Sequence, residues 1–163
     1  MSAFRIALIG NPNCGKTTLF NALTGSHQKV GNWPGVTVEK KTGTFIDENR
    51  DCEIVDLPGI YSLEQDYLGL DEKIARDYLT ASDFDVILNI IDAGNLQRNL
   101  ILTQQLLELG LPVVVAVNML DVAEREGITV DTESLTDQLG VPVAPIIASK
   151  QQGLDELLLQ LFT

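Results

Sequence analysis

The sequence has little cysteine, no long apolar run and no sign of a leader peptide. Two of the 163 residues are cysteine, and Cys14 and Cys52 have neither metal-ligand spacing nor the density of a disulfide framework. Apolar runs such as residues 113–117 are far too short to cross a bilayer. The first residues lead directly into a strand-like run, without the apolar stretch and cleavage site of a secretory signal. We therefore expect one soluble domain in the cytoplasm.

Basic residues are also scarce. The chain has 11 Lys and Arg against 23 Asp and Glu, which gives a net charge of −12. Phosphate backbones are held by clustered Lys and Arg, so this balance argues against nucleic acid as a partner. The single histidine, His27, is interpreted as a solvated loop residue rather than a ligand or a base. An anionic ligand would have to be attracted by a local site.

Residues 10–17 read Gly-Asn-Pro-Asn-Cys-Gly-Lys-Thr and fit the phosphate-loop pattern Gly-x-x-x-x-Gly-Lys-Ser/Thr. They follow an apolar run and precede a helix-like run, so backbone N–H groups and the positive end of that helix can face phosphates. Lys16 adds a charge, and the Thr17 hydroxyl is placed to ligate Mg2+. A reactive role for Cys14 is considered and disfavoured. The predicted nucleotide contacts here are Gly10, Asn13, Cys14, Gly15, Lys16, Thr17 and Thr18.

Hydrophobic periodicity predicts an α/β fold. A central strand at residues 4–9 is followed by a helix and then by an antiparallel hairpin, after which helices and strands alternate. Strands separated by helices imply right-handed crossovers and a parallel sheet. We expect a mostly parallel six-stranded sheet with one antiparallel edge strand and helices on both faces. The expected strands are residues 4–9, 36–46, 51–57, 86–91, 113–117 and 143–147, and the expected helices are residues 17–23, 71–79, 96–109, 134–139 and 154–162.

Two aperiodic stretches interrupt this pattern. Residues 26–37 contain two glycines and a proline, and a loop of that length in a compact domain is more often functional than structural. Trp33 is predicted to be an exposed, mobile aromatic within it. A second aperiodic stretch spans residues 58–70.

Four polar signals fall at the carboxyl ends of predicted strands, where open α/β sheets bind ligands. They are residues 10–17, 56–59, 118–121 and 148–150. Asp56 is positioned to hold Mg2+ through water, and the Gly59 N–H can bond a γ-phosphate. Thr37, next to a strand start, is the predicted second Mg2+ ligand. Gly35 and Val36 are expected to contact the nucleotide beside it.

Residues 118–121 are predicted to select the base. The Asp121 carboxylate can accept hydrogen bonds from a ring N–H and an amino group together, which guanine offers and adenine does not. Asn118 would brace the site, and Met119 could lie on the base. The alternative for Asn118 and Asp121 is a helix N-cap with an acidic first turn. The remaining predicted contacts with the base are Ala148, Ser149 through its N–H, and Lys150 through its stem.

With these motifs in place, the sequence resembles the small GTPase fold of the TRAFAC class, and more narrowly the amino-terminal G domain of FeoB-type bacterial ferrous iron transporters. The resemblance rests on residues 10–17, 30–39, 56–63 and 118–121 and covers essentially the whole chain. It implies a GTP- and GDP-binding domain that regulates ferrous iron uptake at the cytoplasmic face of the inner membrane. It also implies helical regulatory and membrane domains that are absent from this chain.

The predicted reaction is hydrolysis of GTP to GDP and phosphate, with residues 26–37 and 58–70 ordered by the γ-phosphate and Mg2+. Many relatives place a glutamine after Asp-x-x-Gly to orient water, but this chain has Ile60, so intrinsic turnover should be slow. The residues assigned to the reaction are Lys16, Thr37, Gly59 and Asn13.

No arginine is available to stabilise the transition state, because Lys29 is the one fixed cation between Thr24 and Val38. We hypothesise that K+ supplies the charge, held by the Asn13 side-chain oxygen, phosphate oxygens and carbonyls near Gly31 and Trp33. Potassium-activated GTPases similar to FeoB carry asparagine at the position of Asn13, which supports the hypothesis. Asn13 could instead merely stabilise the loop.

Two other function classes stay open. One is a GTPase associated with the ribosome or tRNA, which the acidic balance disfavours. The other is a nucleotide-gated binding module whose hydrolysis is incidental. The oligomeric state is left undetermined by the sequence.

Overall fold

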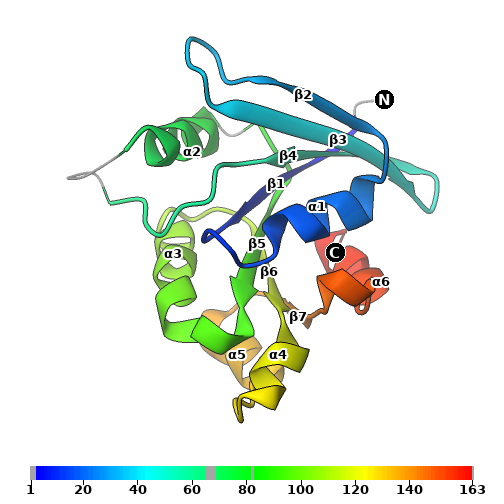
Figure 1. Ribbon diagram of the computed structural model, residues 1–163, viewed down its shortest axis with the longest axis vertical. Helices are drawn as coiled ribbons and strands as arrows, with labels where there is room; N and C mark the ends of the chain where they lie inside the picture. Colours follow the sequence, from blue (N-terminus) through cyan, green and yellow to red (C-terminus); the bar gives the residue numbers. More distant parts are fainter. Residues whose placement is uncertain (1–2, 65–68, 82, 163) are drawn as a thin grey trace.

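The computed structural model describes residues 3–64, 69–81 and 83–162. Among these residues a seven-stranded sheet runs in the order β2-β3-β4-β1-β5-β6-β7 (Figure 1). Strands β1, β4, β5, β6 and β7 pair in parallel, which confirms the predicted α/β class. The strands are β1 (Phe4–Gly10), β2 (Gln28–Asn32), β3 (Glu39–Asp47), β4 (Arg50–Asp56), β5 (Val86–Asp92), β6 (Val113–Asn118) and β7 (Val143–Pro145).

Helices cover both faces of the sheet, as predicted (Figure 1). Successive side chains of a strand point to opposite faces. In β1, Ile6 and Leu8 accordingly belong to one apolar cluster, while Ala7 and Ile9 belong to the other. The first cluster takes residues from α1 and α6, and the second from α2, α3 and α5. The helices are α1 (Lys16–Thr24), α2 (Leu70–Ala81), α3 (Leu96–Glu108), α4 (Leu120–Arg125), α5 (Thr132–Leu139) and α6 (Leu154–Leu161).

The central position of β1 follows from its composition. It lies between β4 and β5, and residues 6–9 have no exposed surface. A strand without a polar face needs apolar neighbours on both sides, and a parallel sheet covered by helices supplies them. Among the described residues, no helix is long and apolar enough to span a membrane.

The sheet has one strand more than the six predicted. Strand β2 lies within residues 26–37, the stretch predicted to be a loop, and pairs antiparallel with β3 from Gln28 opposite Gly43 to Asn32 opposite Glu39. Its sequence, Gln-Lys-Val-Gly-Asn, gives no apolar alternation, and most of the strand is exposed. The strand is therefore stabilised by its backbone hydrogen bonds with β3 and not by burial of its side chains. The antiparallel strand β3 consequently lies one place in from the edge.

The prediction that Trp33 is exposed is wrong. Its side chain is 7% exposed, and its ring packs edge-on against Tyr78 of α2 with ring centres 5.8 Å apart. The Trp33 backbone N–H donates to the Val38 carbonyl over 2.9 Å, and this bond holds the segment that follows β2. The β2–β3 hairpin extends over α2 (Figure 1). Tyr78 of that helix gives the indole an apolar surface that local sequence does not reveal.

Candidate functional site

The loop between β1 and α1 has the backbone shape of an anion site. Asn13 has φ 66° and Gly15 has φ 91°, so the chain turns sharply before α1 begins at Lys16. The first turn of α1 contains no acidic residue, and no side chain caps it. The N–H groups at a helix start have no partner within the helix, so they stay available to an anionic ligand.

Two adjoining cavities open beside this loop. The larger, of about 470 Å3, is bounded by the phosphate loop, by Gly59 and by Asp71 at the start of α2. The smaller, of about 250 Å3, shares Lys16, Gly59 and Asp71 with it and extends toward Asp56. The structure thus brings together two segments that are about forty residues apart in the chain. The larger cavity is lined by Asn11, Pro12, Asn13, Gly15, Lys16, Thr17, Thr18, Gly59 and Asp71, and the smaller also by Val38, Glu39, Lys41, Leu57 and Pro58.

Lys16 and Asp56 form an ion pair at the junction of the cavities, with side chains 13% and 11% exposed. The pair holds the cation of the phosphate loop against the carboxyl end of β4. The Asp56 carboxylate and the Thr17 hydroxyl supply oxygen donors, which are the ligands that Mg2+ prefers. These two residues therefore fit a magnesium ion.

Asn118, at the end of β6, joins three loops. Its Nδ2 donates to the Cys14 carbonyl over 3.0 Å, and its Oδ1 accepts from the Ala148 N–H over 2.9 Å. The residue is 3% exposed. A Cβ at Gly15 would lie 2.2 Å from the Asn118 Nδ2, so glycine is required there. The alternative interpretation of Asn118 as a helix cap is disfavoured, because Met119 is the N-cap of α4 and the Asn118 amide bonds elsewhere.

Asp121 lies at the same rim. Its Oδ2 is 3.4 Å from the Lys150 Nζ and 3.7 Å from a guanidinium nitrogen of Arg125. Partial burial raises the pKa of Asp121, but hydrogen bonds from the Val122 N–H and from Lys150 outweigh it and hold that pKa below its ordinary value. The carboxylate is thus ionised at neutral pH and available as a hydrogen-bond acceptor.

Other predicted residues lie apart from the cavities. Gly31, Gly35 and Thr37 are exposed, and Trp33 is buried against α2. None of them lines either cavity in the described structure, and neither do the predicted base contacts Asn118, Met119, Asp121, Ala148, Ser149 and Lys150. Their roles as ligands stay predictions. Of the aperiodic stretch 58–70, residues 65–68 lie outside the described residues.

Ile60 is 1% exposed and belongs to the apolar core. Its N–H donates to the Gly10 carbonyl over 3.1 Å, which fixes the segment after Asp56 against the phosphate loop. An apolar side chain directed into the core cannot hold water in the cavity.

Sequence reasoning missed two residues at the cavity. Asn11 is 3% exposed, and neither atom of its side-chain amide has a hydrogen-bond partner among the described residues. It occupies a variable position of the motif, so the pattern assigns it no role. Asp71 reads in the sequence as the start of a helix, and only the folded chain places it beside Lys16 and Gly59.

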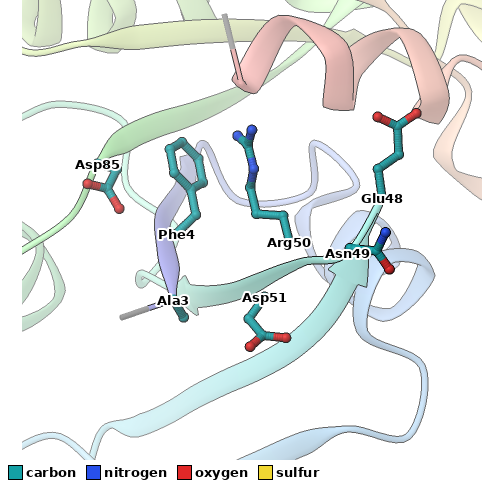
Figure 2. A pocket seen from close by; sticks show the side chains of 7 residues that line it. All are labelled: Ala3, Phe4, Glu48, Asn49, Arg50, Asp51 and Asp85. Carbon is teal, nitrogen blue, oxygen red and sulfur yellow. The ribbon is translucent and has the colours of Figure 1, made fainter. Parts of the chain in front are cut away.

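A third cavity, of about 520 Å3, lies at the other end of the sheet (Figure 2). Its walls include Phe4 and Arg50, at the starts of β1 and β4, and Asp85, just before β5. Figure 2 shows the Arg50 side chain beside the Phe4 ring, and the guanidinium carbon lies 4.2 Å from the centre of the Phe162 ring. Because ligands of open α/β sheets bind beyond the carboxyl ends of the strands, this cavity is not the candidate site.

The mostly parallel sheet, the loop of residues 10–17 at its carboxyl edge and the rim held by Asn118 define a P-loop G domain. Residues 4–161 match the family model described as ferrous iron transport protein B. The chain belongs to that family, which confirms the resemblance seen in the sequence.

Individual relatives agree with this assignment. The Fe(2+) transporter FeoB of Salmonella typhimurium is 51% identical over 159 residues, which are 96% of this chain and 21% of that protein. The chain therefore spans about a fifth of the length of the curated relatives it matches. The cytosolic domain of L. pneumophila FeoB is 55% identical with a TM-score of 0.93, covering 97% of this chain and 68% of that one. A mutant of S. thermophilus NFeoB bound to mGDP is 52% identical with a TM-score of 0.91, covering 98% and 60%.

Replacing Asn118 by alanine should destabilise the fold. The change leaves the Cys14 carbonyl and the Ala148 N–H buried without their partner. We expect the free energy of unfolding to fall by roughly 2–4 kcal/mol, because each buried unpaired group costs about 1–3 kcal/mol. Urea denaturation measures this. The exposed Asn32→Ala serves as the matched control, and an equally small loss in both variants would contradict a bracing role.

The two thiols should make stability depend on alkaline pH. Burial raises the pKa of Cys14, which the nearby Lys16 charge only partly offsets, and burial likewise raises that of Cys52, both to about 11. Unfolded thiols ionise near pH 9, so this stabilisation is complete below pH 9 and is lost as pH rises from about 9 to 11. Unfolding midpoints across that range should fall less steeply in a Cys14→Ala, Cys52→Ala double variant. Parallel curves for the two proteins would contradict the shift.

Proposed function

We propose that this chain binds GTP and GDP with Mg2+ and hydrolyses GTP to GDP and phosphate. The observation that carries the proposal is the Asn118 amide, which joins the phosphate loop to the loop that carries Ser149 and Lys150. The Lys16 ammonium, which would bind phosphates, and the ionised Asp121 carboxylate, which would bind a base, thereby lie at the same edge of the sheet. A solved relative that is 52% identical is bound to mGDP, which supports the assignment.

The phosphates would lie against residues 10–18, with the N–H groups at the start of α1 as donors. Lys16 would leave Asp56 and turn to the phosphates. Bound Mg2+ would neutralise phosphate charge, held by the Thr17 and Thr37 hydroxyls and, through water, by Asp56. Gly35 and Val36 are proposed to contact the nucleotide beside Thr37.

The base would lie between Met119 and the Lys150 stem, with the Ser149 N–H donating to the guanine carbonyl. The ionised Asp121 would accept hydrogen bonds from the guanine ring N–H and amino group together. The side chain of its present partner, Lys150, is 56% exposed, so the ion pair can rearrange at little cost in free energy. Ala148 fixes this loop through its N–H.

Hydrolysis would be slow without help. Lys16, Asn13, the Gly59 N–H and Thr37 are the proposed reaction residues, and the buried Ile60 cannot orient water. We propose that K+ supplies the missing positive charge, held by Asn13 and by carbonyls near Gly31 and Trp33. The side chain of Asn13 is exposed and lines the larger cavity, which favours this assignment.

In the intact relatives, this activity would serve as a switch that regulates ferrous iron uptake. The relatives carry the name Fe(2+) transporter, and this chain would be their cytoplasmic domain at the inner membrane, followed by helical and membrane domains. A second candidate is a nucleotide-gated binding module in which hydrolysis is incidental. The burial of Ile60 favours it, because the residue at the position that usually orients water is part of the apolar core.

Calorimetry with GDP, a GTP analogue and ATP tests the base assignment. The native protein should bind both guanine nucleotides and not ATP. Asp121→Asn should weaken guanine binding by roughly 10- to 100-fold, the range of one bidentate base contact, and should gain xanthine nucleotides. Equal affinity of the native protein for ATP and GTP would refute guanine selection.

Phosphate release in KCl and in NaCl tests the role of potassium. We expect the native protein to hydrolyse GTP roughly tenfold faster in KCl, a fraction of the 10^3 to 10^5 that an arginine finger supplies elsewhere. Asn13→Ala should lose this difference and still bind GDP. Identical rates in the two salts for the native protein would remove K+ from the proposal.

A further inference from the structure

Asn11 is a buried polar side chain of the phosphate loop that lines the larger cavity. It is 3% exposed, and neither its Oδ1 nor its Nδ2 has a hydrogen-bond partner in the part of the chain that the structure describes. A buried polar group without a partner destabilises the fold, and buried amides in folded proteins are nearly always paired. The cost would be offset if Asn11 gained a partner in another conformation of the site.

Residues 59 and 60 contact both chain neighbours of Asn11, which are Gly10 and Pro12. On one side, the Ile60 N–H donates to the Gly10 carbonyl over 3.1 Å. On the other, a Cβ at Gly59 would lie 3.3 Å from the Cα and N of Pro12, so the two backbones are in close contact. Asn11 is therefore at the contact between the phosphate loop and residues 58–60.

We propose that Asn11 is a positioning residue, whose amide bonds the backbone of residues 58–60 when a γ-phosphate occupies the cavity. This inference rests on the proposed function. In this inference the segment shifts along the phosphate loop when the Gly59 N–H contacts a γ-phosphate, and the hydrogen bond from the Ile60 N–H to the Gly10 carbonyl lengthens. The Asn11 amide carries two donor hydrogens and an acceptor oxygen, so it can pair with a displaced carbonyl, a displaced N–H, or both.

This role distinguishes triphosphate from diphosphate. GDP has no γ-phosphate to draw Gly59 inward, so Asn11 gains nothing when GDP binds. With GTP the amide gains a partner, and the segment is held in the position from which Gly59 contacts the phosphate. By bonding the backbone of residues 58–60, the Asn11 side chain thus provides part of the ordering of this segment. The buried side chain of Ile60 cannot provide it.

The test is Asn11→Leu, which keeps the branched shape and removes both unpaired atoms. We expect its melting temperature to equal or exceed that of the native protein, since an apolar group of the same shape relieves the unpaired amide. Its affinity for GDP should stay within about twofold, while its affinity for a non-hydrolysable GTP analogue should fall about tenfold, equivalent to about 1.4 kcal/mol. Differential scanning fluorimetry and calorimetry measure these quantities.

Asn89→Leu is the matched control. Asn89 has no exposed surface, but its Nδ2 donates to the Ile9 carbonyl and its Oδ1 accepts from the Thr103 hydroxyl. Its replacement should lower the melting temperature and leave the ratio of the two affinities unchanged. If Asn11→Leu behaves like this control, or weakens GDP and the analogue equally, Asn11 is structural and the inference fails.

A measurement on the native protein covers the case in which Asn11→Leu does not fold. In NMR spectra, the side-chain NH2 signal of Asn11 should shift and exchange more slowly with the GTP analogue but not with GDP. An unchanged signal with the analogue bound would overturn the inference and leave the proposed function standing. Failure of the native protein to bind either guanine nucleotide would overturn both.

Discussion

One buried amide sets the geometry on which the site depends. Asn118 donates to the loop that follows β1 and accepts from the loop that follows β7, while it belongs to the end of β6. Each loop alone could shift with its own strand, but the shared side chain fixes their spacing. Because Asn118 is 3% exposed, water cannot readily replace either bond. The spacing between the phosphate loop and the loop that carries Ser149 and Lys150 is thus fixed within the core of the molecule.

An acidic chain still forms an anion site because its charges are placed selectively. Helices α2, α5 and α6 begin with acidic residues, which occupy the positive ends of those helices. Helix α1 has none, so its first N–H groups keep their positive potential beside Lys16. Asp56 neutralises Lys16 in this conformation, and in the proposed complex a phosphate would displace it. The net charge of −12 therefore says little about the site, where the start of α1 and the Lys16–Asp56 ion pair lie beside the acidic start of α2.

Features that depend on local pattern could be predicted from the sequence, and features that depend on distant neighbours could not. Residues 6–9 are apolar without interruption, so the central position of β1 followed from them. Strand β2 has no such pattern, because β3 provides its ladder. Trp33 lies between polar and glycine residues, yet Tyr78 of α2 buries it. Likewise, the motif fixes the backbone of the phosphate loop, but only the packing of residues 59–60 on Gly10 and Pro12 shows that Asn11 is enclosed.

Ile60 occupies the position that orients water in many relatives, and here its side chain stabilises the core instead. Ile60 joins Leu57 and Leu63 in the core beneath the loop. Moving such a side chain into water costs about 1.5–3 kcal/mol. A shift of residues 58–60 toward a ligand would therefore have to keep the Ile60 side chain in the core. The segment is therefore better suited to small, backbone-led movements than to full release, and the polar contacts that steer it have to come from the phosphate loop.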